Sequence, residues 1–266
     1  MHHFTQDQLR QALGSVGLSP GDLVMIHSSL YSLGRLEGIP IDEIPSRLYG
    51  SLRRHLGPSG TIVVPTFNFE FCRGMEFDRD LTPSQAMGAF SEYLRLLPEA
   101  WRSPHPIQSV AAVGPLARAI TERNTASAFA RGSSFHALLE FDARLVLVGC
   151  GADAASLIHL AEEWVGVPYR RWKTFSGPYR DDAVLERRTC RLYARDLEED
   201  PTISVAPVAA LLAHRHQLAR APLGGSEIIS CRARHFIGAA VELLRDNPRA
   251  LVDHRPSSTP RSAHGR

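Results

Sequence analysis

Short apolar runs that end abruptly in polar residues recur along this chain, with helical stretches between them. The run Leu23–Ile26 is followed by His27-Ser28-Ser29, and the run Thr61–Pro65 is followed by Thr66-Phe67-Asn68. Buried strands of an α/β sheet have this form, and α/β proteins bind ligands at the carboxyl ends of such strands. The pattern therefore predicts an α/β fold with a ligand site near these two strand exits.

Helix signals separate the predicted strands. Thr5 and Gln8 have the spacing of a capping box, and Thr82-Pro83 resembles a second helix start with Pro at the first helical position. The stretch Arg187–Arg195 alternates like a half-exposed antiparallel strand, so we expect a mixed sheet. Further strands are expected at residues 109–113, 144–148 and 227–231, and further helices at 116–122, 135–139, 205–218 and 234–244.

Composition places the chain among globular proteins, with 44% hydrophobic and 22% charged residues. We expect residues 1–253 to form one continuous domain and the Ser-, Pro- and Arg-rich residues 254–266 to form a disordered tail. No signal peptide or run of about 18 apolar residues is present, so we expect a cytoplasmic protein that does not enter a membrane. The net charge of +2, with basic residues scattered, gives nucleic-acid binding little support.

The segment Ser156–Trp164 contains the residues best suited to chemistry. On a helix, His159, Glu162 and Glu163 share one face, because residues three and four apart are neighbours. A carboxylate beside an imidazole fixes its tautomer and makes it a competent base near neutral pH. The same spacing is also that of an ordinary surface ion pair, and spacing alone does not separate the two interpretations.

Several common types of site are disfavoured. The sequence has no HExxH pair for zinc, no GxSxG elbow and no GxxxxGK[ST] phosphate loop. His214 and His216 are two residues apart and would point away from each other on a helix. We therefore expect no metal cofactor.

A series of short motifs in a fixed order resembles the aminoglycoside 3-N-acetyltransferase family. The resemblance covers roughly residues 5–250, and its motifs stand here as Gly21-Asp22, His27-Ser28-Ser29-Leu30, Ser32-Leu33-Gly34, Gly60-Thr61, Pro65-Thr66-Phe67, Met87-Gly88, Arg102-Ser103-Pro104-His105-Pro106, Ser109, Gly114, Leu157–Glu162 and Val167-Pro168-Tyr169-Arg170. The chain departs from the family pattern at Ser156, where Thr is usual, and at Ser134, where Pro is usual.

The resemblance implies a single α/β unit with a mixed sheet of this family's type, distinct from the GNAT acetyltransferases. It implies transfer of an acetyl group from acetyl-CoA to a primary amine of an aminoglycoside, an amino sugar or a related biosynthetic intermediate. Because the net charge is positive, an acceptor with one amine is preferred over a polycationic resistance drug. A catalytically silent relative that binds CoA or another ligand is the alternative. The sequence leaves open the acceptor, the acyl chain and the oligomeric state, a homodimer included.

The resemblance also implies roles for individual residues. His159 is expected to be the general base and Glu162 its orienting carboxylate, with Glu163 the neighbouring candidate for that role or a substrate ligand. Thr66 is expected at the thioester, where its hydroxyl would help to hold the oxyanion. Contacts to coenzyme A are expected from His27, Ser28, Ser29, Leu30, Ser32, Gly34, Arg102 and Ser103. Acceptor contacts are expected from Asn68, Glu70 and His105, and His105 is a candidate for the wall of the site or for direct catalysis.

Overall fold

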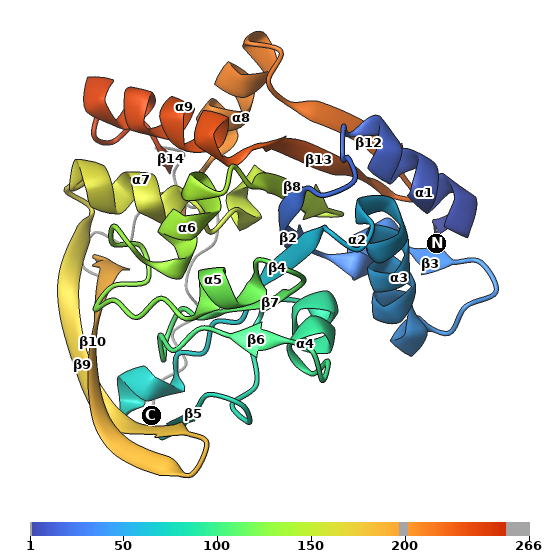
Figure 1. Cartoon of the computed structure of the whole chain (residues 1–266). Helices are drawn as coiled ribbons and strands as arrows, with labels where there is room; N and C mark the ends of the chain where they lie inside the picture. The colour runs from blue at the N-terminus through green and yellow to red at the C-terminus, as the bar shows by residue number, and fades with distance from the viewer. Residues whose placement is uncertain (1, 197–201, 254–266) are drawn as a thin grey trace, which may run out of the picture.

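A seven-stranded mixed sheet forms the centre of the computed structural model, which describes residues 2–196 and 202–253 (Figure 1). In spatial order its strands are β12 (Ala219–Leu223), β13 (Ser226–Arg232), β8 (Arg144–Val148), β2 (Leu23–Ser28), β4 (Thr61–Pro65), β7 (Val110–Val113) and β6 (Trp101–Arg102). The three central strands β8, β2 and β4 are parallel, and the strands that flank them pair antiparallel. The predicted mixed α/β fold is thus confirmed. The tail predicted at residues 254–266 lies outside the described residues.

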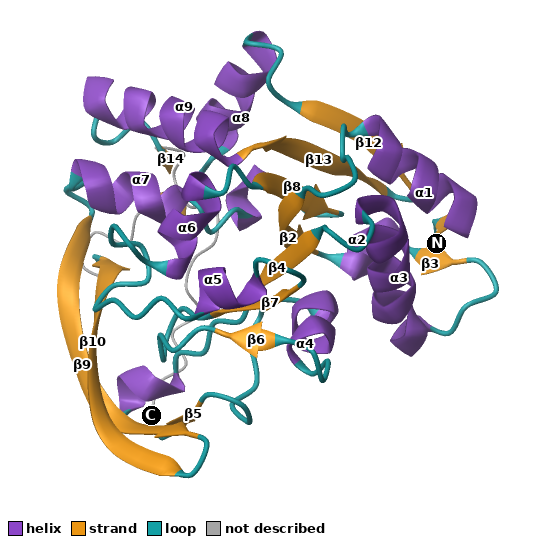
Figure 2. Ribbon diagram, in the orientation of Figure 1, coloured by secondary structure: helices purple, strands orange, loops and turns teal. Residues whose placement is uncertain are grey.

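Helices cover both faces of this sheet (Figure 2). One layer contains α1 (Gln6–Ser15), α3 (Ile44–Leu56) and α4 (Ala89–Arg95), and the other contains α5 (Ala117–Thr121), α6 (Ser134–Glu140), α7 (Ile158–Val165), α8 (Ala206–His214) and α9 (Ala233–Asp246). Along β2, Leu23 and Met25 join the core under the second layer, while Val24 and Ile26 join the core under the first. This division follows from the strand period of two, and it explains why β2 is apolar on both faces.

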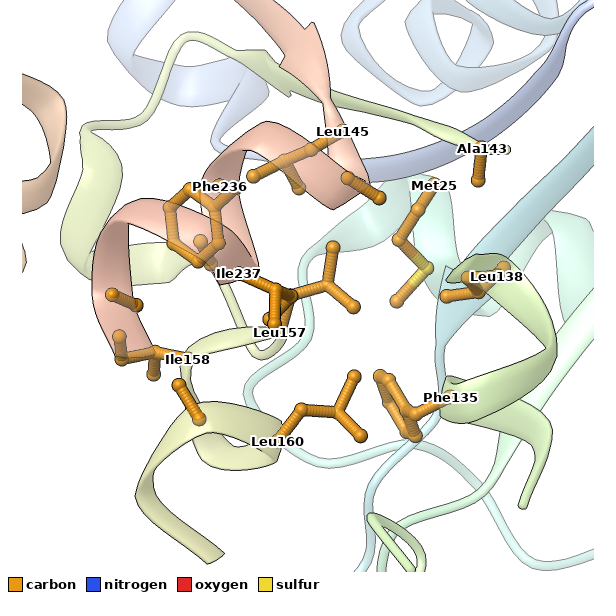
Figure 3. Close-up of a cluster of buried hydrophobic side chains, with 14 of the residues drawn as sticks. Met25, Phe135, Leu138, Ala143, Leu145, Leu157, Ile158, Leu160, Phe236 and Ile237 are labelled. Atoms are coloured by element: carbon orange, nitrogen blue, oxygen red, sulfur yellow. The ribbon is translucent and has the colours of Figure 1, made fainter. Parts of the chain in front are cut away.

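Burial against the core stabilises the short helix α7. A helix of eight residues forms too few helical hydrogen bonds to persist alone in water. Leu157, Ile158 and Leu160 are at most 3% exposed and point into the core that also contains Phe135 and Phe236 (Figure 3). Full burial of one such side chain stabilises the fold by about 1.5–3 kcal/mol. Tertiary packing therefore holds α7 in its position beside the sheet.

A long antiparallel hairpin curves away from the central sheet (Figure 1). Its strands are β9 (Arg170–Asp181) and β10 (Val184–Arg195), each of 12 residues, and β9 also pairs with β5 (Phe77–Asp78). The predicted strand at 187–195 is confirmed within β10, whereas β9 was not predicted. A small separate core packs against the hairpin and contains Phe71, Phe77, Ile107, Tyr179 and Cys190.

The predicted start of a helix at Pro83 is wrong, because α4 begins only at Ala89. The hydroxyl of Thr82 accepts the backbone N–H of Asp78 at 2.8 Å, and the carbonyl of Pro83 accepts the side-chain amide of Asn68 at 2.9 Å. These contacts hold the segment in turns. The capping signal was therefore overridden by competing hydrogen bonds, one of them to a residue that is distant in sequence.

The amino-terminal residues pack against the loop that follows β2. Strand β1 (His3–Phe4) pairs in parallel with β3 (Arg35–Leu36), and the capping box of Thr5 and Gln8 predicted for α1 is confirmed. Between β2 and β3, α2 (Leu30–Leu33) ends at Gly34, whose φ is +96°. A Cβ at Gly34 would overlap the carbonyl oxygen of His2, so only glycine fits. Within the described ranges, no helix is both long and apolar enough to cross a membrane.

We expect Gly34→Ala to lower the free energy of unfolding by about 3 kcal/mol, because backbone strain adds to the overlap with His2. Gly38→Ala is the matched control, since Gly38 also has a positive φ, +69°, but nothing lies within 4 Å of its added Cβ. The control should lose only about 1–2 kcal/mol. Urea denaturation measures both values, and equal losses would contradict the packing argument.

Candidate active site

A cavity of about 680 Å³ opens where the parallel strands β2 and β4 end. His27 and Ser28, the last residues of β2, line it together with Pro65, the last residue of β4. The chain passes from β2 to β4 through α3 on one face of the sheet, and it enters β8 from α6 on the other face. Ligands of α/β proteins bind at such switch points, and the position predicted from the strand exits agrees with this cavity.

Helix α7 presents His159 to the cavity. The Nδ1 atom of His159 lies 2.6 Å from Oε2 of Glu162, which is one helical turn away. The side chain of His159 is 28% exposed and lines the cavity. The ring of Phe129 packs edge-on against the imidazole, with 5.2 Å between ring centroids. When Nδ1 donates its proton to the carboxylate, Nε2 is the nitrogen that can accept a proton.

Glu162 is completely buried and contacts two basic partners. Arg170, the first residue of β9, places its Nε 2.9 Å from the same Oε2 that contacts His159. Burial alone would raise the pKa of Glu162, but the hydrogen bond from His159 and the charges of His159 and Arg170 lower that pKa overall. The carboxylate is therefore ionised at neutral pH and fixes the orientation of the imidazole.

His27 is a second imidazole on the cavity wall. The backbone N–H of Ser156 donates to its Nε2 at 3.1 Å, and the Ser156 hydroxyl lies 2.8 Å from the same nitrogen. Burial, together with the charge of His159, lowers the pKa of His27 to about 3. His27 is therefore neutral near pH 7, and the bond from Ser156 assigns its proton to Nδ1.

Only part of the predicted coenzyme loop reaches the cavity. His27 and Ser28 line it, whereas the hydroxyls of Ser29 and Ser32 bond to each other at 2.8 Å. Leu30 packs against the core under α1 and α3, and Gly34 faces the backbone of His2. The structure thus separates this loop into a cavity-lining start and a continuation that contacts the amino-terminal segment.

Three more predicted site residues are buried in the scaffold beside the cavity. Arg102 donates from Nε to the Ser109 hydroxyl at 3.1 Å and from Nη2 to the Thr66 carbonyl at 2.9 Å. The Thr66 hydroxyl lies 2.9 Å from that of Ser109, and the Ser103 hydroxyl accepts the N–H of Val110. Arg102, Ser103 and Thr66 are not among the described residues that line the cavity.

The four predicted substrate contacts also lie outside the described cavity lining. Asn68 anchors the loop at Pro83, and Glu70 pairs with Arg73 at 2.7 Å. Nδ1 of His105 accepts the N–H of Gln108 at 3.0 Å, and burial lowers the pKa of His105 to about 4. Glu163 accepts a hydrogen bond from Ser127. The carboxylate that contacts His159 is that of Glu162.

Sequence reasoning missed the wall that the β9–β10 hairpin contributes. Arg170, Lys173 and Phe175 of β9 line the cavity, together with Leu192 and Tyr193 of β10. The paired Asp181-Asp182 is the signal that could have revealed the hairpin, because Asp182 has φ +52° at its turn.

Across residues 2–196 and 202–253, no cluster of His, Cys, Asp and Glu suits a metal ion.

Comparison with known proteins gives concordant matches. The family model for aminoglycoside 3-N-acetyltransferases matches residues 25–245. Aminoglycoside N(3)-acetyltransferase III of Salmonella sp is 30% identical over 192 residues, which are 65% of this chain and 65% of that protein. Aminoglycoside N(3)-acetyltransferase VII of Streptomyces paromomycinus is 29% identical over 214 residues, which are 73% of this chain and 72% of that protein. The match thus spans slightly less than two thirds of the Salmonella protein.

Solved structures share the fold. Aminoglycoside acetyltransferase AAC(3)-Xa superposes with a TM-score of 0.80 at 24% identity, over 94% of both chains. The apoenzyme of AAC(3)-IVa superposes with a TM-score of 0.76 at 26% identity, over 94% of this chain and 92% of that one. The family model matches residues 25–245, which are most of this chain. The chain therefore belongs to the aminoglycoside 3-N-acetyltransferase family.

Proposed function

We propose that this chain transfers an acetyl group from acetyl-CoA to a primary amine, with His159 as general base. The observation that carries the proposal is the contact of His159 with the buried carboxylate of Glu162 at the wall of a cavity. Family membership supports the reaction type, because the curated relatives are named aminoglycoside N(3)-acetyltransferases.

The proposed reaction begins with deprotonation of the acceptor, since an ammonium has no lone pair with which to attack. Nε2 of His159 takes this proton, and the amine nitrogen then bonds to the thioester carbonyl carbon. The carbon–sulfur bond breaks, and the coenzyme leaves as a thiolate that takes up the second proton lost by the attacking nitrogen. Glu162 stabilises the imidazolium formed in the first step, while Arg170 keeps Glu162 ionised.

The proposed acceptor is an aminoglycoside, an amino sugar or a related biosynthetic intermediate. The names of the relatives support an aminoglycoside, and a variant of AAC(3)-IVa, 26% identical to this chain, has been solved in complex with a gentamicin. Direct contact between His159 and Glu162 favours an active enzyme over a silent relative that only binds ligand. The proposed co-substrate is acetyl-CoA, and the proposed reaction requires no metal. We place this reaction in the cytoplasm.

Replacement of His159 with Ala should lower kcat at least 100-fold, because general base catalysis contributes about 10²–10⁴-fold. Release of free CoA, followed with a thiol reagent across a panel of aminoglycosides, amino sugars and simple amines, measures the loss. His136→Ala is the matched control: His136 forms a similar helical pair with Glu140 at 2.9 Å but does not line the cavity. Comparable turnover in wild type and His159→Ala would refute the assignment of the base.

Replacement of Glu162 with Gln should lower kcat about 10- to 100-fold and also destabilise the protein, because Arg170 then lacks its buried counter-ion. A loss of about 3 kcal/mol in the free energy of unfolding is expected. Glu140→Gln removes the matched carboxylate from the control pair and should leave kcat unchanged. If the folded Glu162→Gln protein kept full kcat, the carboxylate would have no part in orienting the base.

A further inference from the structure

Lys173 is the only lysine in the 266-residue sequence, so arginine supplies the other 29 of its 30 lysine and arginine side chains. This single lysine lies on β9 and lines the cavity that contains His159. The two cationic side chains differ chemically: lysine has a compact, strongly hydrated charge with three rotatable donors, whereas the guanidinium is a planar fork. The single lysine of the chain thus lies in the wall of the candidate active site.

The hairpin register places Lys173 among apolar neighbours. Leu192 is its direct cross-strand partner, and Phe175, two residues along β9, lies on the same face. All three residues line the cavity. Lys173 itself is exposed, so its ammonium is free to reach an anionic group that enters the cavity.

The charges of the described cavity lining leave Lys173 without a carboxylate partner. Arg170 is neutralised by Glu162, and the one carboxylate among the described lining residues, Asp153, accepts the backbone N–H of Val205. No ion pair joins Lys173 to a carboxylate of residues 2–196 and 202–253. This wall of the cavity therefore favours an anionic group on a bound ligand.

We propose that Lys173 binds a phosphate group of a bound substrate. A point charge with rotatable donors suits the tetrahedral arrangement of phosphate oxygens. This inference rests on the proposed function for the identity of the substrates, because coenzyme A carries phosphates and an amino sugar acceptor can carry one as well. The bound phosphate comes either from the coenzyme or from the acceptor, and the two sources are separable by experiment.

Amine-specific labelling tests the proposal without any need for turnover. Among the amines of this chain, trinitrobenzenesulfonate can modify only Lys173 and the α-amine, and peptide mapping separates these two sites from each other and from any modified cysteine. We expect a saturating phosphate-bearing ligand to slow the labelling of Lys173 about tenfold relative to that of the α-amine, whose labelling reports any reagent consumed by the ligand's own thiol or amine. CoA against pantetheine tests the coenzyme as the source, and glucosamine 6-phosphate against glucosamine tests the acceptor. The proposal is overturned if neither phosphate-bearing compound protects, or if the phosphate-free partner protects equally at saturation.

Binding measurements on variants give a second, independent readout. Lys173→Gln should weaken binding of the protecting ligand about tenfold by calorimetry, as expected for loss of one charge-assisted hydrogen bond, and Lys173→Arg should restore part of the affinity. Arg187→Gln is the control, because Arg187 is exposed on the same hairpin and does not line the cavity. Equal effects of Lys173→Gln and Arg187→Gln would reject a local contact. If wild type acetylates no amine while CoA still protects Lys173, the proposed function fails and this inference stands.

Discussion

The ionised carboxylate of Glu162 is the point on which the candidate site depends. It is completely buried and contacts side chains of two consecutive elements, His159 of α7 and Arg170 of β9. A buried charge is tolerated only when its partners are held in place, so both elements must keep a fixed position relative to each other. The same carboxylate therefore orients the imidazole and adds to the contacts, such as the pairing of β9 with β5, that hold the hairpin against the rest of the fold.

The remaining architecture holds this contact at the edge of the sheet. The apolar side chains of α7 that face the core fix the helix, while β2 supplies His27 to the wall of the same cavity. Arg102 bonds to the Thr66 carbonyl and to the Ser109 hydroxyl, which fixes the exit of β4. Two layers of helices and a buried network of hydrogen bonds thus position a small number of polar side chains.

Local patterns in the sequence predicted the parts of the fold that local interactions determine. The capping box at Thr5, the buried strands and the spacing of His159 and Glu162 are of this kind. The segment at Pro83 and the position of Arg102 depend on partners many residues away, which spacing does not reveal. Strand β9 escaped prediction because its cavity-facing side carries the charged Lys173, so its alternation of apolar and polar residues is weak.

The parallel pairing of β1 with β3 couples the amino-terminal segment to the loop that follows β2. The carbonyl of His2 accepts the N–H of Arg35 at 2.9 Å, and that of Phe4 accepts the N–H of Glu37 at 3.0 Å. Chain ends usually tolerate extensions and deletions, but here such a change acts on the loop that continues from His27 and Ser28. Removal of His2 would therefore take away the carbonyl that accepts the N–H of Arg35 in this loop.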